Sequence, residues 1–513
     1  MLVVIELRTD NGDTLMEKIN KKLKAIYTIL LSNLNVLILA SVHTALTVYS
    51  DKTFFYGSAR EHVLTIVFAK LIVFSVLFFW WKGILILFAG KNKKIYEIFS
   101  YSLPYGIFLL IYLFCKHSMS LTGDEFNIYS QAMQYNIFPY HFTYLTGLVY
   151  IVSYMIVPCQ MGTVFVKVLF QSLTCGYCVY RMKRYFGKKG YLCFILFLLY
   201  PVMTNGIEAH RMQFYGLLYL ASSVKLLFDW WENKKLTWND LFVLSLAYSI
   251  LGIWRKEGIY LLIIAPVMIC FAYHILQKSY IKKVFIVYLV VFGIVYIPQC
   301  FSPRSFLSES SHTYNEWFVN MCREGLDKSK YPVQMKMIDK YMSLAAVDYI
   351  NEQLGDENYE DEYIAWRPGY VGIRDGATLA EYNDYEKAVR YLVIHEPCVF
   401  LKTRIGLWKY TAGSLNTSSV LNLYESLTSS LNIPLIVMLV VTIMSIIKQK
   451  WLTFFMAGFS IAHCMVTLLF SPAAYFKYYY HMYLLGWLFL IVIVIGINSR
   501  IESLLHIPNK LRE

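Results

Sequence analysis

Long apolar runs separated by short polar stretches dominate this chain of 513 residues. A helix needs about 20 mostly apolar residues to cross roughly 30 Å of hydrocarbon. Because 57% of the residues are hydrophobic and only 16% are charged, a soluble globule of this length would lack the polar surface that it needs. The sequence therefore predicts an all-α polytopic membrane protein.

The runs predict about 12 transmembrane helices in a multi-pass protein of the cell membrane, with a margin of about two because several runs are short. They cover residues 26–49, 63–89, 97–115, 160–180, 190–204, 212–230, 240–254, 258–275, 284–300, 432–447, 451–470 and 480–497.

Lys and Arg residues cluster in the short loops between these runs, and cytoplasmic loops of membrane proteins hold such an excess. The orientation that places these loops inside also places both termini, residues 1–25 and 498–513, in the cytoplasm. The net charge of +13 then reflects membrane topology, so we expect no nucleic-acid binding.

This orientation depends on residues 138–157, which are nearly apolar enough to form a further span. The stretch begins near Pro139 and is interrupted by polar and aromatic residues, which suit a helix lying along the membrane interface. If it crossed, the densest basic loop would lie outside. We therefore expect an interfacial helix over 138–157, with a true span as the alternative.

Residues 301–430 are too polar for lipid and are expected to form a mostly helical extracytoplasmic region, since apolar residues recur there at spacings of three and four. Residues 302–404 hold 17 of the chain's 34 Asp and Glu residues. Cys322 and Cys398 fall in this region, where oxidising conditions would permit a disulfide. The region separates a transmembrane module, 26–300, with an acidic outer loop at 116–137, from C-terminal transmembrane helices at 431–497.

The adjacent acids Asp124 and Glu125 carry the strongest functional signal, because they directly follow an apolar run that ends near Cys115. Ionised side chains are costly near hydrocarbon, so such a pair indicates chemistry or ion handling, unless it lies in a solvated loop. A carboxylate at this place can take a proton from an acceptor hydroxyl.

Three further polar clusters are expected on the same outer face, and their cations could hold a phosphate as negative charge develops on it. Each has a plainer interpretation, as a solvated turn, as interface anchors or as an aromatic belt. The clusters are Glu208, His210 and Arg211; Arg255, Lys256 and Glu257; and Lys477 and Tyr478.

The order of these motifs resembles the C-type (GT-C) superfamily of integral-membrane glycosyltransferases, in particular the bacterial relatives of protein O-mannosyltransferases and aminoarabinose transferases. The similar elements are Gly123-Asp-Glu125, Pro139-Tyr-His141, Tyr180 to Lys189, Arg255-Lys-Glu-Gly258, His395 to Arg404 and Lys477-Tyr478. The chain departs from the family in two extra spans before the acidic loop and in Tyr140-His141, where better-known members have His-Pro-Pro or Lys-Pro-Pro.

The resemblance implies inverting transfer of a hexosyl or pentosyl group from a polyprenyl-phosphate donor to a glycan, lipid or protein acceptor of the cell envelope. Asp124 is then the general base, and Glu125 orients the acceptor or assists a metal. Arg211, Arg255 and Lys477 would hold the donor phosphate, and His141 would contact substrate. Participation of a divalent metal is left open by the family.

Two other classes of function stay open. A transporter or flippase of lipid-linked sugars would place ionisable residues at mid-span, and a polysaccharide polymerase would centre its site on cations. A membrane scaffold without catalytic activity is a third alternative.

Overall fold

The structure is a computed structural model that describes residues 33–89, 92–116, 121, 123–139, 142–208, 210–275, 277–302, 311–354, 373–413, 419–471 and 475–504. These residues form helices and no β-strand. The chain divides into a first unit, Met1–Phe194 with Gly206–Ala209, and a second unit, Ile195–Asn205 with His210–Glu513. The predicted segment 1–25 lies outside the described residues, and the last helix continues to Leu504, into the predicted tail.

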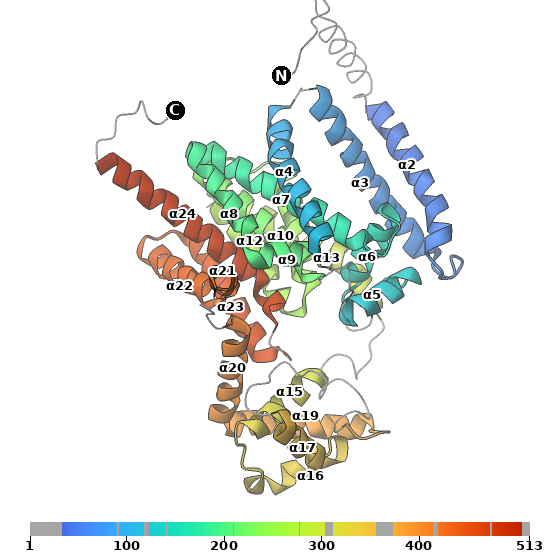
Figure 1. Ribbon diagram of the computed structural model, residues 1–513, viewed down its shortest axis with the longest axis vertical. Coiled ribbons are helices and arrows are strands. Elements are labelled where there is room, and N and C mark those ends of the chain that lie inside the picture. Colours follow the sequence, from blue (N-terminus) through green and yellow to red (C-terminus); the bar gives the residue numbers. More distant parts are fainter. Residues whose placement is uncertain are drawn as a thin grey trace, which may run out of the picture. The chain divides into compact units, whose positions relative to one another are not determined.

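The first unit begins with an antiparallel hairpin of two helices, α2 (Asn33–Phe54) and α3 (Val63–Ala89), which lie side by side (Figure 1). The Nζ atom of Lys70 lies 2.5 Å from a carboxylate oxygen of Asp51 and donates a hydrogen bond of 2.8 Å to Oγ1 of Thr47. Both charged side chains are largely shielded, so their attraction is little screened by solvent. A shielded ion pair thus joins the two helices near their turn.

Helices α4 (Lys93–Lys116) and α7 (Gly162–Phe186) form the closest pair in the first unit. A Cβ atom on Gly176 would collide with the Ser102 side chain and the Ile98 carbonyl, so only glycine permits this approach. Further along α4, Tyr105 accepts a hydrogen bond of 2.7 Å from Gln171. Residues further along α4 therefore contact residues earlier in α7, so the two helices are antiparallel.

The antiparallel pairing means that the chain leaves α4 and enters α7 at the same end. The connection contains α5 (Gly123–Met133) and α6 (Tyr144–Ile156). The 13 residues of α6 extend about 20 Å, which is too short to cross a bilayer. Of these residues, 11 are buried within the protein, and the placement of α6 at the membrane interface stays a prediction.

Three short elements follow α7, namely η1 (Gly187–Leu192), α8 (Cys193–Leu198) and α9 (Tyr200–Ile207). The first of these continues directly from α7, which lengthens that apolar segment to Leu198. The predicted span at 190–204 is therefore divided between pieces that are each much shorter than a membrane-crossing helix.

The second unit contains two groups of apolar helices. The first group is α10 (Met212–Trp231), α11 (Trp238–Trp254), η2 (Lys256–Tyr260), α12 (Leu261–Ala272), α13 (Lys278–Tyr296) and η3 (Ile297–Phe301). The second group is α21 (Val420–Ser429), α22 (Asn432–Ile447), α23 (Trp451–Phe470), η5 (Phe476–Tyr479) and α24 (Tyr480–Leu504).

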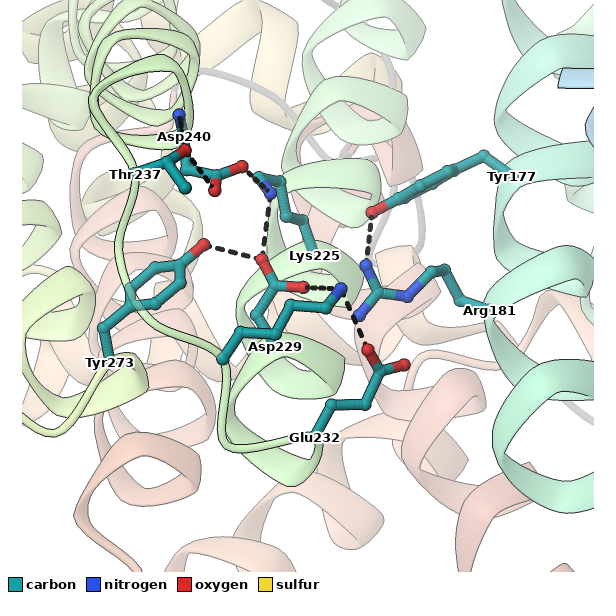
Figure 2. Close-up of polar contacts among 9 residues, drawn as sticks. Tyr177, Arg181, Lys225, Asp229, Glu232, Thr237, Asp240 and Tyr273 are labelled. Atoms are coloured by element: carbon teal, nitrogen blue, oxygen red, sulfur yellow. Dashed lines mark hydrogen bonds and ion pairs between the residues drawn. The ribbon is translucent and has the colours of Figure 1, made fainter. Parts of the chain in front are cut away.

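A network of charged side chains ties the ends of α10, α11 and α12 together (Figure 2). The buried carboxylate of Asp229 accepts hydrogen bonds from Lys225 at 2.9 Å, Lys234 at 2.8 Å and Tyr273 at 2.6 Å. Lys225 also bonds Asp240 at 2.6 Å. Because each buried charge has an opposite charge or a hydrogen-bond donor beside it, the network offsets the cost of desolvation.

The same end of the second unit gathers two of the basic loops. Lys450, in the turn between α22 and α23, lies 5.6 Å from the centre of the Trp230 ring, one residue beyond Asp229. The loop that contains Lys234 is therefore near the loop that contains Lys450. This agrees with their expected emergence on one membrane face.

Seven helices in the described part of the chain are long and apolar enough to cross a membrane, so the count of 12 is not confirmed. Helix α10 has 20 residues but includes Gln213, Lys225 and Asp229, and α11 and α12 are shorter. Because 15 of its 20 residues are buried within the protein, α10 needs less apolar surface than a lipid-facing helix. The seven are Val63–Ala89, Lys93–Lys116, Gly162–Leu198, Lys278–Phe301, Asn422–Ile447, Trp451–Phe470 and Phe476–Ile497.

The polar region between the two groups forms a small helical body with its own core. Its elements are α15 (Ser311–Arg323), η4 (Lys328–Lys330), α16 (Pro332–Tyr341), α17 (Leu344–Leu354), α19 (Leu379–His395) and α20 (Pro397–Ala412), which confirms the prediction of short amphipathic helices. Phe318, Ile338 and Tyr385 are fully buried in its core. Its predicted boundary at 430 falls inside the apolar segment Asn422–Ile447.

This helical body is fixed to the end of α23 by three hydrogen bonds. Trp317 donates to the carbonyl of Leu469 at 3.0 Å, and Thr313 donates to that of Phe470 at 3.3 Å. Arg404 donates to the carbonyl of Ser471 at 3.0 Å. The last carbonyls of a helix have no partner within it, so the polar region supplies the missing donors.

Cys322 and Cys398 are free thiols, so the disulfide considered for them does not form. Cys398 is exposed, whereas Cys322 packs against the core of the helical body.

We predict that Lys70→Met lowers the free energy of unfolding by about 3 kcal/mol, because it leaves the shielded carboxylate of Asp51 without its partner. The measurement is thermal unfolding in detergent. Lys82→Met on the same helix, where the amine has a long contact to Asn33 and lies 5.7 Å from the centre of the Phe78 ring, should change stability by less than about 0.5 kcal/mol. Equal effects of Lys70→Met and Lys82→Met would contradict the stabilising role of the ion pair. Adding Asp51→Asn to Lys70→Met should recover most of the lost free energy of unfolding.

A second prediction concerns the two thiols of the polar region. Burial raises the pKa of the Cys322 thiol to about 12, so at pH 8.5 almost none of it is the reactive thiolate. We expect a maleimide to label exposed Cys398 in the folded protein and to reach Cys322 only after denaturation, as measured by mass spectrometry of the two peptides. Rapid labelling of Cys322 in the native protein would show that α15 does not pack as described.

Candidate functional site

Helix α5 carries the acidic pair, and its apolar face explains how one acid enters the protein interior. Ile128 and Ala132 are fully buried and stand three and seven residues after Glu125, on the same side of the helix. The side chain of Glu125 is accordingly only 1% exposed. An acid in the first turn is also favoured by the positive end of the helix dipole. The side chains of Asp124 and His141 lie outside the described residues.

A buried lysine on α7 faces this acid. Lys167 is fully buried and interacts electrostatically with Glu208 and Glu125, which come from two different parts of the sequence. Its Nζ atom makes no hydrogen bond to any residue that the structure describes. A buried ammonium without hydrogen bonds is rare, and an anionic or hydroxyl group of a ligand would satisfy it.

The position of Glu208 follows from close packing one helical turn beyond Lys167. Gly206 lies against the Gln171 side chain, and a Cβ atom at that position would be 2.9 Å from Oε1 of Gln171. The absence of a side chain at residue 206 therefore lets the chain approach α7. The first unit thus unites Glu125, Lys167 and Glu208, of which the sequence had indicated only the two acids.

In the second unit, Arg255 meets the Lys477-Tyr478 segment, 223 residues away in the chain. Arg255 ends α11, and its guanidinium donates a hydrogen bond of 3.0 Å to the Tyr478 carbonyl while lying 5.3 Å from the centre of the Tyr478 ring. The Nζ atom of Lys477 is 5.9 Å from the same ring and 4.2 Å from the ring of Tyr475. Two of the predicted clusters therefore form one cationic and aromatic group.

A second arginine holds the start of the same segment. Arg404 is almost fully buried, and it bonds the carbonyl of Ser471, whereas Arg255 bonds that of Tyr478. Both arginines thus fix the backbone that carries Lys477. Because a guanidinium presents donors in a planar fork, it can bond a carbonyl and keep further donors for another group.

Two stacked histidines lie beneath this segment. The rings of His463 and His481 are both buried, with centres 4.5 Å apart. The hydroxyl oxygen of Tyr260 lies 3.2 Å from Nδ1 of His463. Tyr215 meets both rings edge-on. Ionisable residues inside a membrane domain are rare and mostly functional, so this stack belongs to the candidate site.

The remaining predicted residues are distributed between the two units. His210 and Arg211 are half-buried at the start of α10 in the second unit, whereas Glu208 belongs to the first unit. The side chains of Lys256 and Glu257 lie outside the described residues. The convergence of the acids with Arg211, Arg255 and Lys477 in one cavity stays a prediction.

Sequence reasoning missed Lys167, Arg404 and the histidine pair. Lys167 had a clear signal, because it is the single charged residue in the apolar run 160–180. Arg404 ends a stretch that the family resemblance had already indicated, and His481 lies three residues after Tyr478, but only the folded chain shows both side chains buried. His463 lies within α23, and no motif or residue spacing in the sequence marks it as functional.

The arrangement offers carboxylates and a buried amine in one unit and cations with aromatic rings in the other. Among the residues that the structure describes, no three His, Cys, Asp or Glu side chains gather as metal ligands.

We predict that Arg255→Met frees the segment at residues 475–481. Losing a charge-assisted hydrogen bond should speed amide hydrogen exchange in this peptide by at least about tenfold. Arg374→Met, which removes an exposed cation paired at the surface with Asp339, should leave the exchange of the peptide unchanged. Equal exchange in the wild type and Arg255→Met would show that Arg255 does not fix the segment.

Comparison with known proteins gives no relative for this chain, since no protein-family model, no curated protein and no solved structure matches it.

Proposed function

We propose that this chain is a membrane glycosyltransferase of the C-type superfamily. It would move a sugar from a polyprenyl-phosphate donor to a glycan, lipid or protein acceptor on the extracytoplasmic face, with inversion at the anomeric carbon. In this proposal both termini are cytoplasmic and the chain acts in the cell membrane. The seven apolar helices support a bilayer environment, in which a polyprenyl tail would be soluble.

The observation that carries the proposal is the group formed by Glu125, Lys167 and Glu208. Burying the Lys167 amine and the Glu125 carboxylate, with half-buried Glu208 in electrostatic contact, is costly, and such groups are found mainly where they bind or react. The group lies next to the helix that bears Asp124, at the end where the chain returns between α4 and α7. A carboxylate base and a cation for phosphate are the two features that transfer from a phosphate-linked sugar requires.

In the proposed reaction the Asp124 carboxylate takes the proton of an acceptor hydroxyl. The hydroxyl oxygen forms a bond to the anomeric carbon from the face opposite the phosphate, while the bond from that carbon to the phosphate oxygen breaks. The electron pair leaves with the phosphate, so polyprenyl phosphate is the second product. Glu125 orients the acceptor, and Lys167 offsets the negative charge of the carboxylates.

The cations of the second unit are the candidates for the departing phosphate. Arg255 lies over Tyr478 with Lys477 nearby, and Arg211 begins α10. An arginine can bind two phosphate oxygens at once, and its charge becomes more effective as water is excluded.

A transporter or flippase of lipid-linked sugars is the second candidate, because buried ionisable residues occur within apolar helices. Lys167, His463 and His481 are the examples. A transporter would move the intact lipid-linked sugar and would break no glycosidic bond.

We predict that Asp124→Asn lowers the transfer rate by about 10²–10⁴-fold, the usual contribution of a general base. The assay follows release of polyprenyl phosphate from a panel of polyprenyl-phosphate sugars by the protein in lipid nanodiscs. Lys167→Met should also lose at least about 100-fold, while Lys167→Arg keeps the charge and should retain more activity. Glu61→Gln, at an exposed carboxylate of the α2–α3 turn, is the matched control and should be fully active.

Full activity of Asp124→Asn would remove the general base from the proposal. If the wild type instead carries intact lipid-linked sugar across a liposome membrane and releases no polyprenyl phosphate, the transporter is the correct function.

A further inference from the structure

We propose that the N-terminal hairpin of α2 and α3 is a positioning device that holds α5, the helix of the acidic pair, in a fixed orientation. The inference rests on the proposed function, because it assigns α5 the catalytic acids. The hairpin turn, residues 55–58, is the part that contacts α5.

The backbone of the turn caps the C-terminal end of α5. The amides of Tyr56 and Gly57 both donate to the carbonyl of Met133, at 3.1 Å and 3.2 Å. Met133 is the last residue of α5, and its carbonyl has no partner within the helix. The cap thus comes from a segment more than 70 residues earlier in the chain. Helices more commonly end with a glycine that directly follows them and caps the last carbonyls.

The side chain of Tyr56 adds a second attachment one turn earlier. Its hydroxyl donates a hydrogen bond of 3.0 Å to the Ser130 carbonyl and lies 3.4 Å from the Ser130 hydroxyl. Two consecutive turns of α5 are therefore bonded to one residue of the hairpin. Bonds at two heights on a helix resist both its sliding and its rotation.

Gly57 allows the turn to come this close. A Cβ atom at residue 57 would lie 2.6 Å from the carbonyl carbon and oxygen of Gln134, which follows α5 directly. Both of these are backbone atoms, so they cannot move aside as the end of a flexible side chain could. Any larger residue at 57 has to push the turn and α5 apart.

The aromatic neighbours of the turn fix the chain where it leaves α5. Phe55 stacks on Tyr135 with ring centres 4.5 Å apart and planes 9° from parallel. Tyr135 has a positive φ of 59°, a conformation that costs energy for a residue other than glycine. The stack helps to hold this reversal, which ends the helix at a fixed point.

The hairpin is stiff enough to serve as an anchor. The Asp51–Lys70 ion pair joins α2 to α3 just before the turn, and Phe54 packs against Tyr154 of α6 at 5.8 Å. Tyr129 of α5 packs edge-on against the same Tyr154 ring at 5.4 Å. The hairpin, α5 and α6 therefore share one aromatic contact as well as the backbone bonds.

The geometry of α5 shows why this anchor affects the acids. Glu125 is eight residues from Met133, which is about 12 Å along a helix. A tilt of roughly 10° about the capped end would move Glu125 by about 2 Å over that length. Misplacing a catalytic group by 1 Å can cost on the order of 100-fold in rate.

The test compares Gly57→Ala and Tyr56→Phe with the control Gly83→Ala in full-length protein in lipid nanodiscs. Gly83 lies in α3 of the same hairpin, and a Cβ atom there would meet only the Phe99 ring at 3.8 Å. Amide hydrogen exchange of peptides covering residues 123–136 is measured without substrate. The values of kcat and KM are measured with a polyprenyl-phosphate sugar that the wild type uses.

We expect Gly57→Ala to speed exchange in α5 at least about tenfold and to lower kcat by about 10–100-fold, with KM for the donor nearly unchanged. Tyr56→Phe, which removes one hydrogen bond and keeps the ring, should change both quantities about two- to tenfold. If Gly57→Ala fails to fold, Tyr56→Phe still tests the proposal. Gly83→Ala should match the wild type in both measurements.

Unchanged exchange in α5 for Tyr56→Phe and a folded Gly57→Ala would overturn the clamp. Faster exchange with unchanged kcat would overturn the positioning role, since α5 would be loosened without consequence for the reaction. If the wild type transfers no sugar at all, the proposed function fails and the positioning claim falls with it. The exchange data then still decide whether the hairpin restrains α5.

Discussion

The close approach of α4 and α7 at Gly176 determines the arrangement of the first unit. With no side chain at this position, Ile98 and Ser102 of α4 reach the backbone of α7, and the two helices pair antiparallel. Everything between them, including α5 and α6, must then leave and return at one end. Because Asp124 and Glu125 lie on that connection, the packing contact at Gly176 determines at which end of the helix pair the acids lie.

Much of the fold could be predicted because membrane helices depend on composition. Apolar runs indicated the helices, and spacings of three and four indicated α16 and α19. The burial of α6 within the protein could not be predicted, because a side chain that faces lipid and one that faces protein are equally apolar. The span count was not confirmed for a related reason, since α10 is buried among other helices and can include Lys225 and Asp229.

The candidate site was predictable where residue type alone is unusual. Glu125 and Arg255 stood out as charges beside apolar runs, and the contact of Arg255 with Tyr478 agrees with their expected proximity. Lys167 was overlooked although its isolation in an apolar run is the same kind of signal. The histidine pair could not be found from sequence, because its members meet only when α23 and α24 pack together.

The three hydrogen bonds that join the polar region to the end of α23 also bear on how the chain is made. Thr313, Trp317 and Arg404 are synthesised before α23, so their donors exist before Leu469, Phe470 and Ser471 emerge from the ribosome. If the polar region has already folded, α23 completes its end on a prepared surface as it enters the bilayer. The end of α23 thus meets donors from a part of the chain that has already been made.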